Sequence, residues 1–184
     1  TVESGVGNND MPGDLRFFTN GGTTTATERM RLNSAGILTK PYTPSFFVTI
    51  NGTDATTNTG HYIPWNVAKH NNGGHYSTSA YYFTAPVDGF YYFFAQLWAK
   101  NGTSNARFHF YYEDASNSYA GDQITQNGMH AQGLNRTDVS ITASVVWQMG
   151  AGDRMGVRPD NSNLTYYTAG ASDPHSYFCG YFIG

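Results

Sequence analysis

Apolar and polar residues alternate along most of the chain with the two-residue period of β-strands, and no segment predicts a helix. Residues 83–94 (FTAPVDGFYYFF) show this most clearly. Pro86 presets its backbone φ and Gly89 tolerates a positive one, so the sequence predicts a turn between two strands. The aromatic run that follows is too dense for a sheet with one solvated face. It predicts a strand that is covered on both faces.

The same pattern predicts about eight strands in the larger, C-terminal part of the chain. They span residues 46–51, 62–65, 81–84, 89–99, 106–113, 140–149, 154–159 and 177–183. Residues 114–138 form a long polar stretch, which we expect to be a loop with at most one short strand. This number of short strands is typical of two packed sheets, and we expect an all-β sandwich of the jelly-roll type.

Residues 14–38 show a shorter β pattern of the same kind. Two alternating stretches, at 14–20 and 28–32, are separated by a glycine pair and a run of threonines. Strands this short are marginal in water unless they pack on another surface. The segment therefore predicts a small β structure that cannot bury much apolar surface by itself.

Pro41 and Pro44 mark the boundary between the two patterns. Proline lacks the backbone N–H that a sheet uses and restricts the residue before it, so continuous strand pairing is disfavoured at this point. We therefore predict two domains, a short β segment at residues 1–40 and a larger β domain at residues 41–184.

The composition supports an ordered β protein and excludes several classes of partner. Aromatic residues reach 16% and charged residues only 12%, and the net charge is −3. The many aromatic residues can supply the buried area that folding requires. Without a basic cluster there is no electrostatic basis for nucleic-acid binding, and no apolar run approaches the ~20 residues of a membrane-spanning helix. We expect neither nucleic-acid binding nor membrane insertion.

Three motifs in the larger domain resemble the globular head domain of complement component 1q, within the tumour-necrosis-factor-like jelly-roll superfamily. Residues 76–93 follow its spacing of Tyr, Phe, a turn and Tyr-Tyr-Phe. Residues 144–157 (SVVWQMGAGDRMGV) follow its apolar alternation and Gly-Asp turn, and residues 176–183 (SYFCGYFI) follow its last strand. The chain departs from the family at Tyr81, where Gly is frequent, and at Asp88, where Pro or Ala is common. The resemblance implies a jelly-roll head that assembles as a homotrimer.

The last predicted strand favours a trimer by its own pattern. Phe178 and Phe182 share one face of this strand, whereas the odd-numbered residues from 177 to 183 share the other. The interior of a sandwich can take only one of these faces. The second face is either exposed to water or covered by a partner, and a threefold neighbour is the economical partner.

Residues 14–38 resemble the shaft-end repeat of many bacteriophage tail fibres. The shared pattern is a strand, a polar turn, Glu-Arg-Met-Arg-Leu at 28–32 and a Ser-x-Gly turn at 34–36. The resemblance implies three chains wound together, with each strand paired to another chain. The alternative is an N-terminal hairpin of one globular domain. Residues 1–44 contain no collagen-like Gly-x-y stalk, which favours a fibre tip over a secreted animal protein.

Both resemblances together imply a non-catalytic, trimeric tip of a phage tail fibre that binds a host cell-surface receptor. We expect a glycan or protein receptor and an extracellular location on the virion. Two alternatives stay open: a secreted complement 1q-like lectin or matrix protein, and a tailspike depolymerase. Aromatic and amide side chains on loops suit sugar rings and hydroxyl groups. The candidate contacts are Trp65, Tyr119, Asn127, His130, Tyr166, Tyr167 and His175.

No motif in the sequence predicts catalysis or a cofactor. The six histidines lack the spacing of a helical metal site, and the 13 acidic residues show no pair placed for glycoside hydrolysis. Cys179, the single cysteine, predicts a packed thiol and excludes an intrachain disulfide. The resemblance to the head domain implies a calcium site near the trimer axis, which would use Asn105 and Asp114. An asparagine at the first position lowers the charge available to calcium, and a solvated strand end is the alternative.

Overall fold

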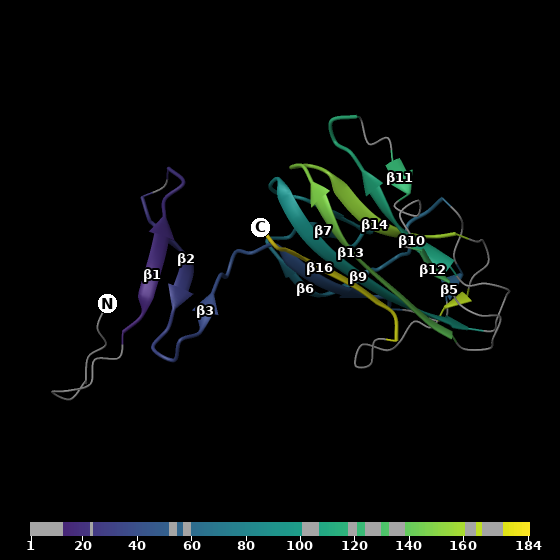
Figure 1. Ribbon diagram of the computed structural model, residues 1–184, viewed down its shortest axis with the longest axis horizontal. Coiled ribbons are helices and arrows are strands. Elements are labelled where there is room, and N and C mark those ends of the chain that lie inside the picture. Colours follow the sequence, from purple (N-terminus) through teal and green to yellow (C-terminus); the bar gives the residue numbers. More distant parts are fainter. Residues whose placement is uncertain are drawn as a thin grey trace. The chain divides into compact units, whose positions relative to one another are not determined.

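The computed structural model describes residues 13–22, 24–51, 55–56, 60–100, 107–117, 121–123, 130–132, 139–160, 165–166 and 175–184. Every regular element in these residues is a β-strand, which confirms the all-β prediction. No helix among them is long and apolar enough to cross a membrane. The chain divides into two compact units, Thr1–Thr43 (unit 1) and Pro44–Gly184 (unit 2). Figure 1 shows the strands of both units, which are described separately below.

Unit 1 contains one small antiparallel sheet. Its strands follow one another in the order β1 (Leu15–Thr19), β2 (Thr27–Leu32) and β3 (Leu38–Thr39). The register between β1 and β2 shifts between Phe17 and Phe18, where β2 carries an extra residue. Asn33 shapes the turn before β3, because its Oδ1 accepts the backbone N–H groups of Ala35 and Ile37 at 3.1 and 2.8 Å. In this structure all three strands pair within a single chain.

Unit 2 consists of two stacked antiparallel sheets, as a jelly roll requires. Within the described residues, the aromatic sheet has seven strands: β6 (Val67–Asn72), β4 (Ser45–Thr49), β16 (Tyr177–Phe182), β9 (Gly89–Lys100), β13 (Val139–Met149), β15 (Thr165–Tyr166) and β5 (Ala55–Thr56). The second sheet has six described strands: β7 (Tyr76–Ser77), β8 (Tyr82–Thr84), β14 (Arg154–Pro159), β10 (Arg107–Glu113), β11 (Gly121–Gln123) and β12 (His130–Gln132). The long β9 lies near the middle of the aromatic sheet and pairs with both β13 and β16.

Most of the predicted strands agree with the structure. The predictions at 89–99, 106–113, 140–149 and 154–159 match β9, β10, β13 and β14 with ends that differ by at most one residue. The strand predicted at 62–65 is wrong, because this segment is not part of a ladder. Its alternation has another cause: Ile63 and Trp65 are both fully buried. The stretch at 114–138 holds two short strands, β11 and β12, instead of at most one.

The core between the two sheets is built mainly from aromatic rings. β9 contributes Tyr91 and Phe93, both fully buried. Phe178 of β16 packs against Phe46 with 4.9 Å between ring centroids, and it also contacts Phe93 at 6.1 Å. Gly180 allows this close packing, since a Cβ there would lie 2.6 Å from the Phe93 ring. The prediction that Phe178 faces the core is confirmed.

Tyr81 has an unusual backbone conformation. Its φ of +67° lies in the left-handed region, and it is the one such non-glycine residue in the described part of the chain. A bulky residue in this region costs of order 1–3 kcal/mol. The conformation explains why a glycine is frequent at this position in the resembled family, since glycine adopts a positive φ without strain.

Candidate functional site

The face of the aromatic sheet that points away from the core carries a patch of apolar side chains, with Ser144 and Gln148 of β13 beside them. The apolar side chains come from four neighbouring strands and the chain end after β16. We call this set the aromatic face: Phe47, Phe90, Tyr92, Phe94, Val146, Tyr177, Cys179, Tyr181 and Ile183. None of these residues carries a charge.

The two-residue period of the strands places these side chains together. In β9, Tyr91 and Phe93 point into the core, so Tyr92 and Phe94 point to the opposite face. The ladder then sets Tyr181 of β16 beside Tyr92, and Val146 of β13 beside Tyr92 on the other side. The aromatic face therefore follows directly from sequence alternation and strand register.

The rings of the aromatic face contact one another across the strands. Tyr177 stacks on Phe47 at 5.2 Å and on Phe94 at 5.6 Å, with interplanar angles of 27° and 23°. Tyr92 and Tyr181 lie 5.3 Å apart. Such cross-strand aromatic pairs stabilise a sheet and hold the rings in fixed positions.

This face is nevertheless open to solvent in the single chain. Phe90, Val146, Tyr181 and Ile183 are 48%, 52%, 49% and 53% exposed. The sequence predicted a β9 covered on both faces, and one chain covers only one of them. Monomeric soluble proteins rarely expose contiguous apolar patches of this kind, so the aromatic face has the character of an association surface.

Cys179 lies within the aromatic face and is half-buried. Burial raises the pKa of its thiol above the ordinary value, which disfavours the reactive thiolate. Burial also raises the pKa of the neighbouring Tyr177 hydroxyl, with smaller contributions from Cys179 and Tyr92. The surroundings of Cys179 fit a packed thiol and not a nucleophile.

A second group of side chains lies on the outward face of the second sheet. It consists of three tyrosines and two arginines arranged around one carboxylate, and we call it the tyrosine–arginine row: Tyr62, Tyr82, Tyr111, Glu113, Arg154 and Arg158. Tyr62 lies flat over Gly156, where any Cβ would collide with its ring. Centroid distances of 5.7 Å to Tyr82 and 6.0 Å to Tyr111 place Tyr62 between the other two rings.

The two arginines of the row share Glu113. Arg158 donates to Glu113 Oε1 at 3.1 Å, and Arg154 Nη1 lies 3.6 Å from Oε2. The Arg158 guanidinium also lies 3.3 Å from the Tyr111 ring centroid and 4.4 Å from that of Tyr62. Burial, followed by the Glu113 carboxylate, raises the pKa of Tyr62. These half-buried guanidinium and phenol groups can donate to hydroxyl or carboxylate oxygens of a ligand.

Sequence reasoning missed this row, although part of its signal was available. Arg154 and Arg158 are four residues apart in β14, and both lie on the same face of the strand. The contribution of Tyr62 could not be found in the same way, because it lies outside the strands and meets the row only through the tertiary structure.

Two of the predicted receptor contacts are core residues. Trp65 and Tyr166 are both fully buried, and the Trp65 ring lies 6.3 Å from that of Phe178. A fully buried ring has no surface to offer a receptor, so these two residues are removed from the candidates. The sequence predicts both as exposed aromatic contacts, but their rings turn inward.

The other predicted residues divide into described and undescribed ones. His175 is half-buried, and its ring meets Trp98 edge-on at 4.4 Å. The backbone of His130 belongs to β12, whereas its side chain lies outside the described part of the structure. Tyr119, Asn127 and Tyr167 also lie outside it.

Only one of the two predicted calcium ligands, Asp114, belongs to the described residues, because Asn105 lies outside them. The Asp114 carboxylate accepts the N–H and the hydroxyl of Ser116, both at 2.7 Å, and these bonds lower its pKa. Among the described residues, no three His, Cys, Asp or Glu side chains lie close enough to hold a metal ion. Through its bonds to Ser116, Asp114 stabilises the turn after β10.

Comparisons with known proteins agree with this architecture. The profile of the C1q domain matches residues 45–183. The globular domain of zebrafish complement 1qA is similar in structure, with a TM-score of 0.59 and 16% identity over 77% of this chain and 98% of that one. Eiger TNF from S. frugiperda (TM-score 0.62, 9% identity, 77% and 93% coverage) and murine APRIL (0.58, 12%, 77% and 99%) are also similar. No curated protein sequence matches the chain.

Proposed function

The chain belongs to the C1q domain family, and from that premise we propose that it is a homotrimeric binding module that assembles through its aromatic face. Domains of the C1q and TNF type are typically non-enzymatic, often trimeric, and bind ligands or receptors. The observation that carries the proposal is the aromatic face itself. It is an uncharged patch of stacked rings on a sheet whose other face forms the core. Its burial between copies would remove from water the apolar surface that one chain leaves exposed.

We further propose that the module is the tip of a bacteriophage tail fibre and that it binds a cell-surface glycan of the host. The support for the viral setting is the shaft-end pattern of residues 28–36, which directly precedes the head. The head by itself is equally compatible with a secreted C1q-like protein, since domains of this family are usually extracellular.

The tyrosine–arginine row is the part of the described surface that suits a glycan best. Tyrosine rings pack against the apolar faces of sugars, and the guanidinium groups of Arg154 and Arg158 donate to sugar oxygens. His175 stays a second candidate, together with Tyr119, Asn127, His130 and Tyr167. A trimer presents each contact three times, so that weak individual sites can give strong adhesion.

The assembly is tested by placing a charge in the aromatic face. Tyr181→Asp would bury a carboxylate between copies, so we expect sedimentation to show folded monomers where the unchanged protein gives trimers. Val87→Asp is the matched control, because Val87 is 46% exposed in the turn before β9 and outside the aromatic face. A stable, folded monomer of the unchanged protein at micromolar concentration would contradict the proposal.

Binding is tested with a glycan array that is probed with the purified trimer, followed by adhesion to host cells. We expect Arg158→Gln to weaken binding to the glycans that the unchanged protein selects, while Lys69→Gln, on β6 of the other sheet, leaves it unchanged. Equal binding by both variants would exclude the row as the contact surface. Release of oligosaccharides from the host envelope, abolished by changing one carboxylate, would instead favour a depolymerase.

A further inference from the structure

The sheet of unit 1 has no core of its own. None of its described residues is buried, and every one is either half-buried or exposed. Several of its apolar side chains are among the most open of the described residues: Leu15 is 57% exposed, Phe17 44%, Leu32 40% and Leu38 53%. Phe18, which is 53% exposed, pairs with Glu28 and lies on the other face. A three-stranded sheet of this size requires a packed apolar face to be stable in water. Something other than the described part of unit 1 must therefore cover these side chains.

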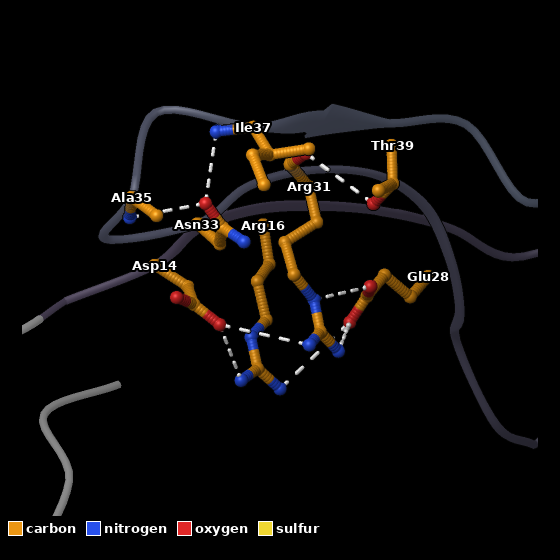
Figure 2. A network of polar contacts seen from close by, with 8 residues as sticks. All are labelled: Asp14, Arg16, Glu28, Arg31, Asn33, Ala35, Ile37 and Thr39. Carbon is orange, nitrogen blue, oxygen red and sulfur yellow. Dashed lines mark hydrogen bonds and ion pairs between the residues drawn. The ribbon is translucent and has the colours of Figure 1, made fainter.

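The two faces of this sheet are chemically different. One face carries a closed network of four charges, in which Arg16 bonds Asp14 at 2.8 Å and Arg31 bonds Glu28 through two atoms at 2.8 and 2.9 Å. Longer ion pairs, Arg16 to Glu28 at 3.8 Å and Arg31 to Asp14 at 3.7 Å, close the ring. Figure 2 shows the four side chains turned toward one another on the same side of the strands. Two cations and two anions balance, so this face offers no net charge to a partner.

The opposite face is apolar over most of its length and polar at one end, where Thr19 pairs with Thr27 and Arg29 donates to Thr19 Oγ1 at 2.9 Å. The ladder pairs Leu15 with Leu32 and Leu32 with Leu38, so these three leucines form one row across the sheet. Phe17 pairs with Met30 in the next row on the same face. We call these five residues the leucine face. None of these five residues is charged, whereas the four-charge network occupies the other side.

We propose that the leucine face packs against the leucine faces of two other copies of this chain, so that three single-layer sheets form one shared apolar core with their charge networks outward. This inference rests on the trimeric head proposed above. Only residues 40–44 separate β3 from β4, a reach of at most roughly 17 Å at about 3.4 Å per residue. A trimeric head would therefore hold three leucine faces together at an effective concentration in the millimolar range.

The form of the sheet determines how another copy can meet it. β2 already pairs with β1 on one edge and β3 on the other, and the ladders close within one chain. A second copy can therefore bind either through the apolar face or through the outer edges of β1 and β3. An uncharged apolar face is complementary to an identical one, and face packing buries the leucines, whereas pairing through the edges would leave them exposed.

Cross-linking of the full-length chain tests this packing. In a Cys179→Ser background, Phe17→Cys places a thiol on the leucine face, and Thr39→Cys places one on the face of the charge network, where Thr39 pairs with Arg31. With a short bismaleimide we expect covalent dimers between chains for Phe17→Cys and at least about fivefold less for Thr39→Cys. Neither residue contributes to the core of unit 2, so the head should fold in both variants.

Several outcomes would overturn the inference. If sedimentation shows an intact trimer but Phe17→Cys gives no cross-link, another surface covers the leucine face, and unit 2 of the same chain is the first alternative. Equal cross-linking at both positions would indicate strands exchanged between chains and not packed faces. If sedimentation shows a monomer, the proposed trimeric head is wrong, and the packing of leucine faces is wrong with it. An intact trimer without the cross-link contradicts the leucine-face packing alone.

Amide hydrogen exchange gives a second measurement that requires no new thiol. In the trimer we expect the backbone amides of β2 to exchange slowly, because both of its edges are paired and its apolar face is covered. In the Tyr181→Asp monomer we expect their exchange to accelerate by about tenfold or more, whereas core strands such as β9 keep most of their protection. Unchanged exchange of β2 in a verified monomer would contradict packing between copies.

Discussion

The two units of this chain use the same alternating pattern but differ in the number of layers that it builds. In unit 2, the inward residues of two sheets meet, so that Phe93, Phe178 and Phe83 are all at most 1% exposed. In unit 1 the described strands form a single sheet, and Leu15 stays 57% exposed. An alternating sequence therefore ensures that apolar residues share a face, but it does not provide the second surface that buries them.

The comparison also shows where each unit depends on other copies of the chain. The described part of unit 2 has a core between its two sheets and leaves the outward face of its aromatic sheet uncovered, so a partner should add stability to a head that has its own core. The described residues of unit 1 form no core, and under the packing proposed above they would obtain one from partners. Four predictions test this difference, in decreasing order of the change that each should produce.

The first prediction removes a core ring from unit 2. Phe178→Ala should lower the free energy of unfolding of the head by about 3–5 kcal/mol, because the ring contacts Phe46 and Phe93 at the centre of the sandwich. The change is measured by chemical denaturation in the monomeric Tyr181→Asp background. In the same background Phe17→Ala should have an effect below about 1 kcal/mol, since Phe17 is already exposed in the single chain. Similar losses for the two variants would contradict the difference between the units.

The second prediction adds one methyl group to each unit. In Gly180→Ala the new Cβ would lie 2.6 Å from the Phe93 ring and 2.9 Å from Phe46, so the two rings must move. Overpacking of this kind costs about 1–3 kcal/mol, which denaturation can measure. Gly21→Ala is the control in unit 1, because no atom lies within 4 Å of the position where its Cβ would be. An unchanged free energy of unfolding for Gly180→Ala would show that the aromatic core can take up the extra methyl group without cost.

The third prediction uses Cys179 as a probe of the aromatic face. Burial raises the pKa of its thiol, so at pH 8 a thiol reagent should modify it more slowly than free cysteine. In the Tyr181→Asp monomer the rate should increase several-fold, because the neighbouring copies no longer cover the sulfur. An equal rate in trimer and monomer would mean that Cys179 lies outside the interface.

The smallest effect is expected from acid on the charge network of unit 1. Hydrogen bonds from Arg16 and Arg31 lower the pKa values of Asp14 and Glu28 below their ordinary values of 3.8 and 4.5. A carboxyl group with a lowered folded-state pKa stabilises the fold fully above its unfolded pKa. That contribution is lost as the pH falls through the folded value.

Unit 1 should therefore lose a little stability on acidification from about pH 5 toward pH 3. The loss should be small, because the groups are exposed and screened by solvent. NMR titration of the two carboxyl groups checks it, with Glu28→Gln as the comparison. An increase in unit 1 stability over that range would contradict the network.

The class of the fold and most of its strands follow from local patterns along the chain. The period of two and the turn chemistry of Pro86 and Gly89 are local properties, so they could be interpreted without knowledge of the rest of the chain. The division of the last strand into an inward and an outward face was also local, and Phe178 confirmed it. At the C1q-like head, a few motif positions were enough to indicate the family.

Which side chains are available to a ligand depends on how the two sheets pack together. Trp65 and Tyr166 were predicted as contacts, yet their rings turn into the core, because burial depends on what the other sheet places against them. Tyr62 meets Arg158 and Tyr111 across segments far apart in the chain, and no local pattern encodes that meeting. Alternation fixes which residues share a face, whereas the packing of layers decides whether that face is core, interface or surface.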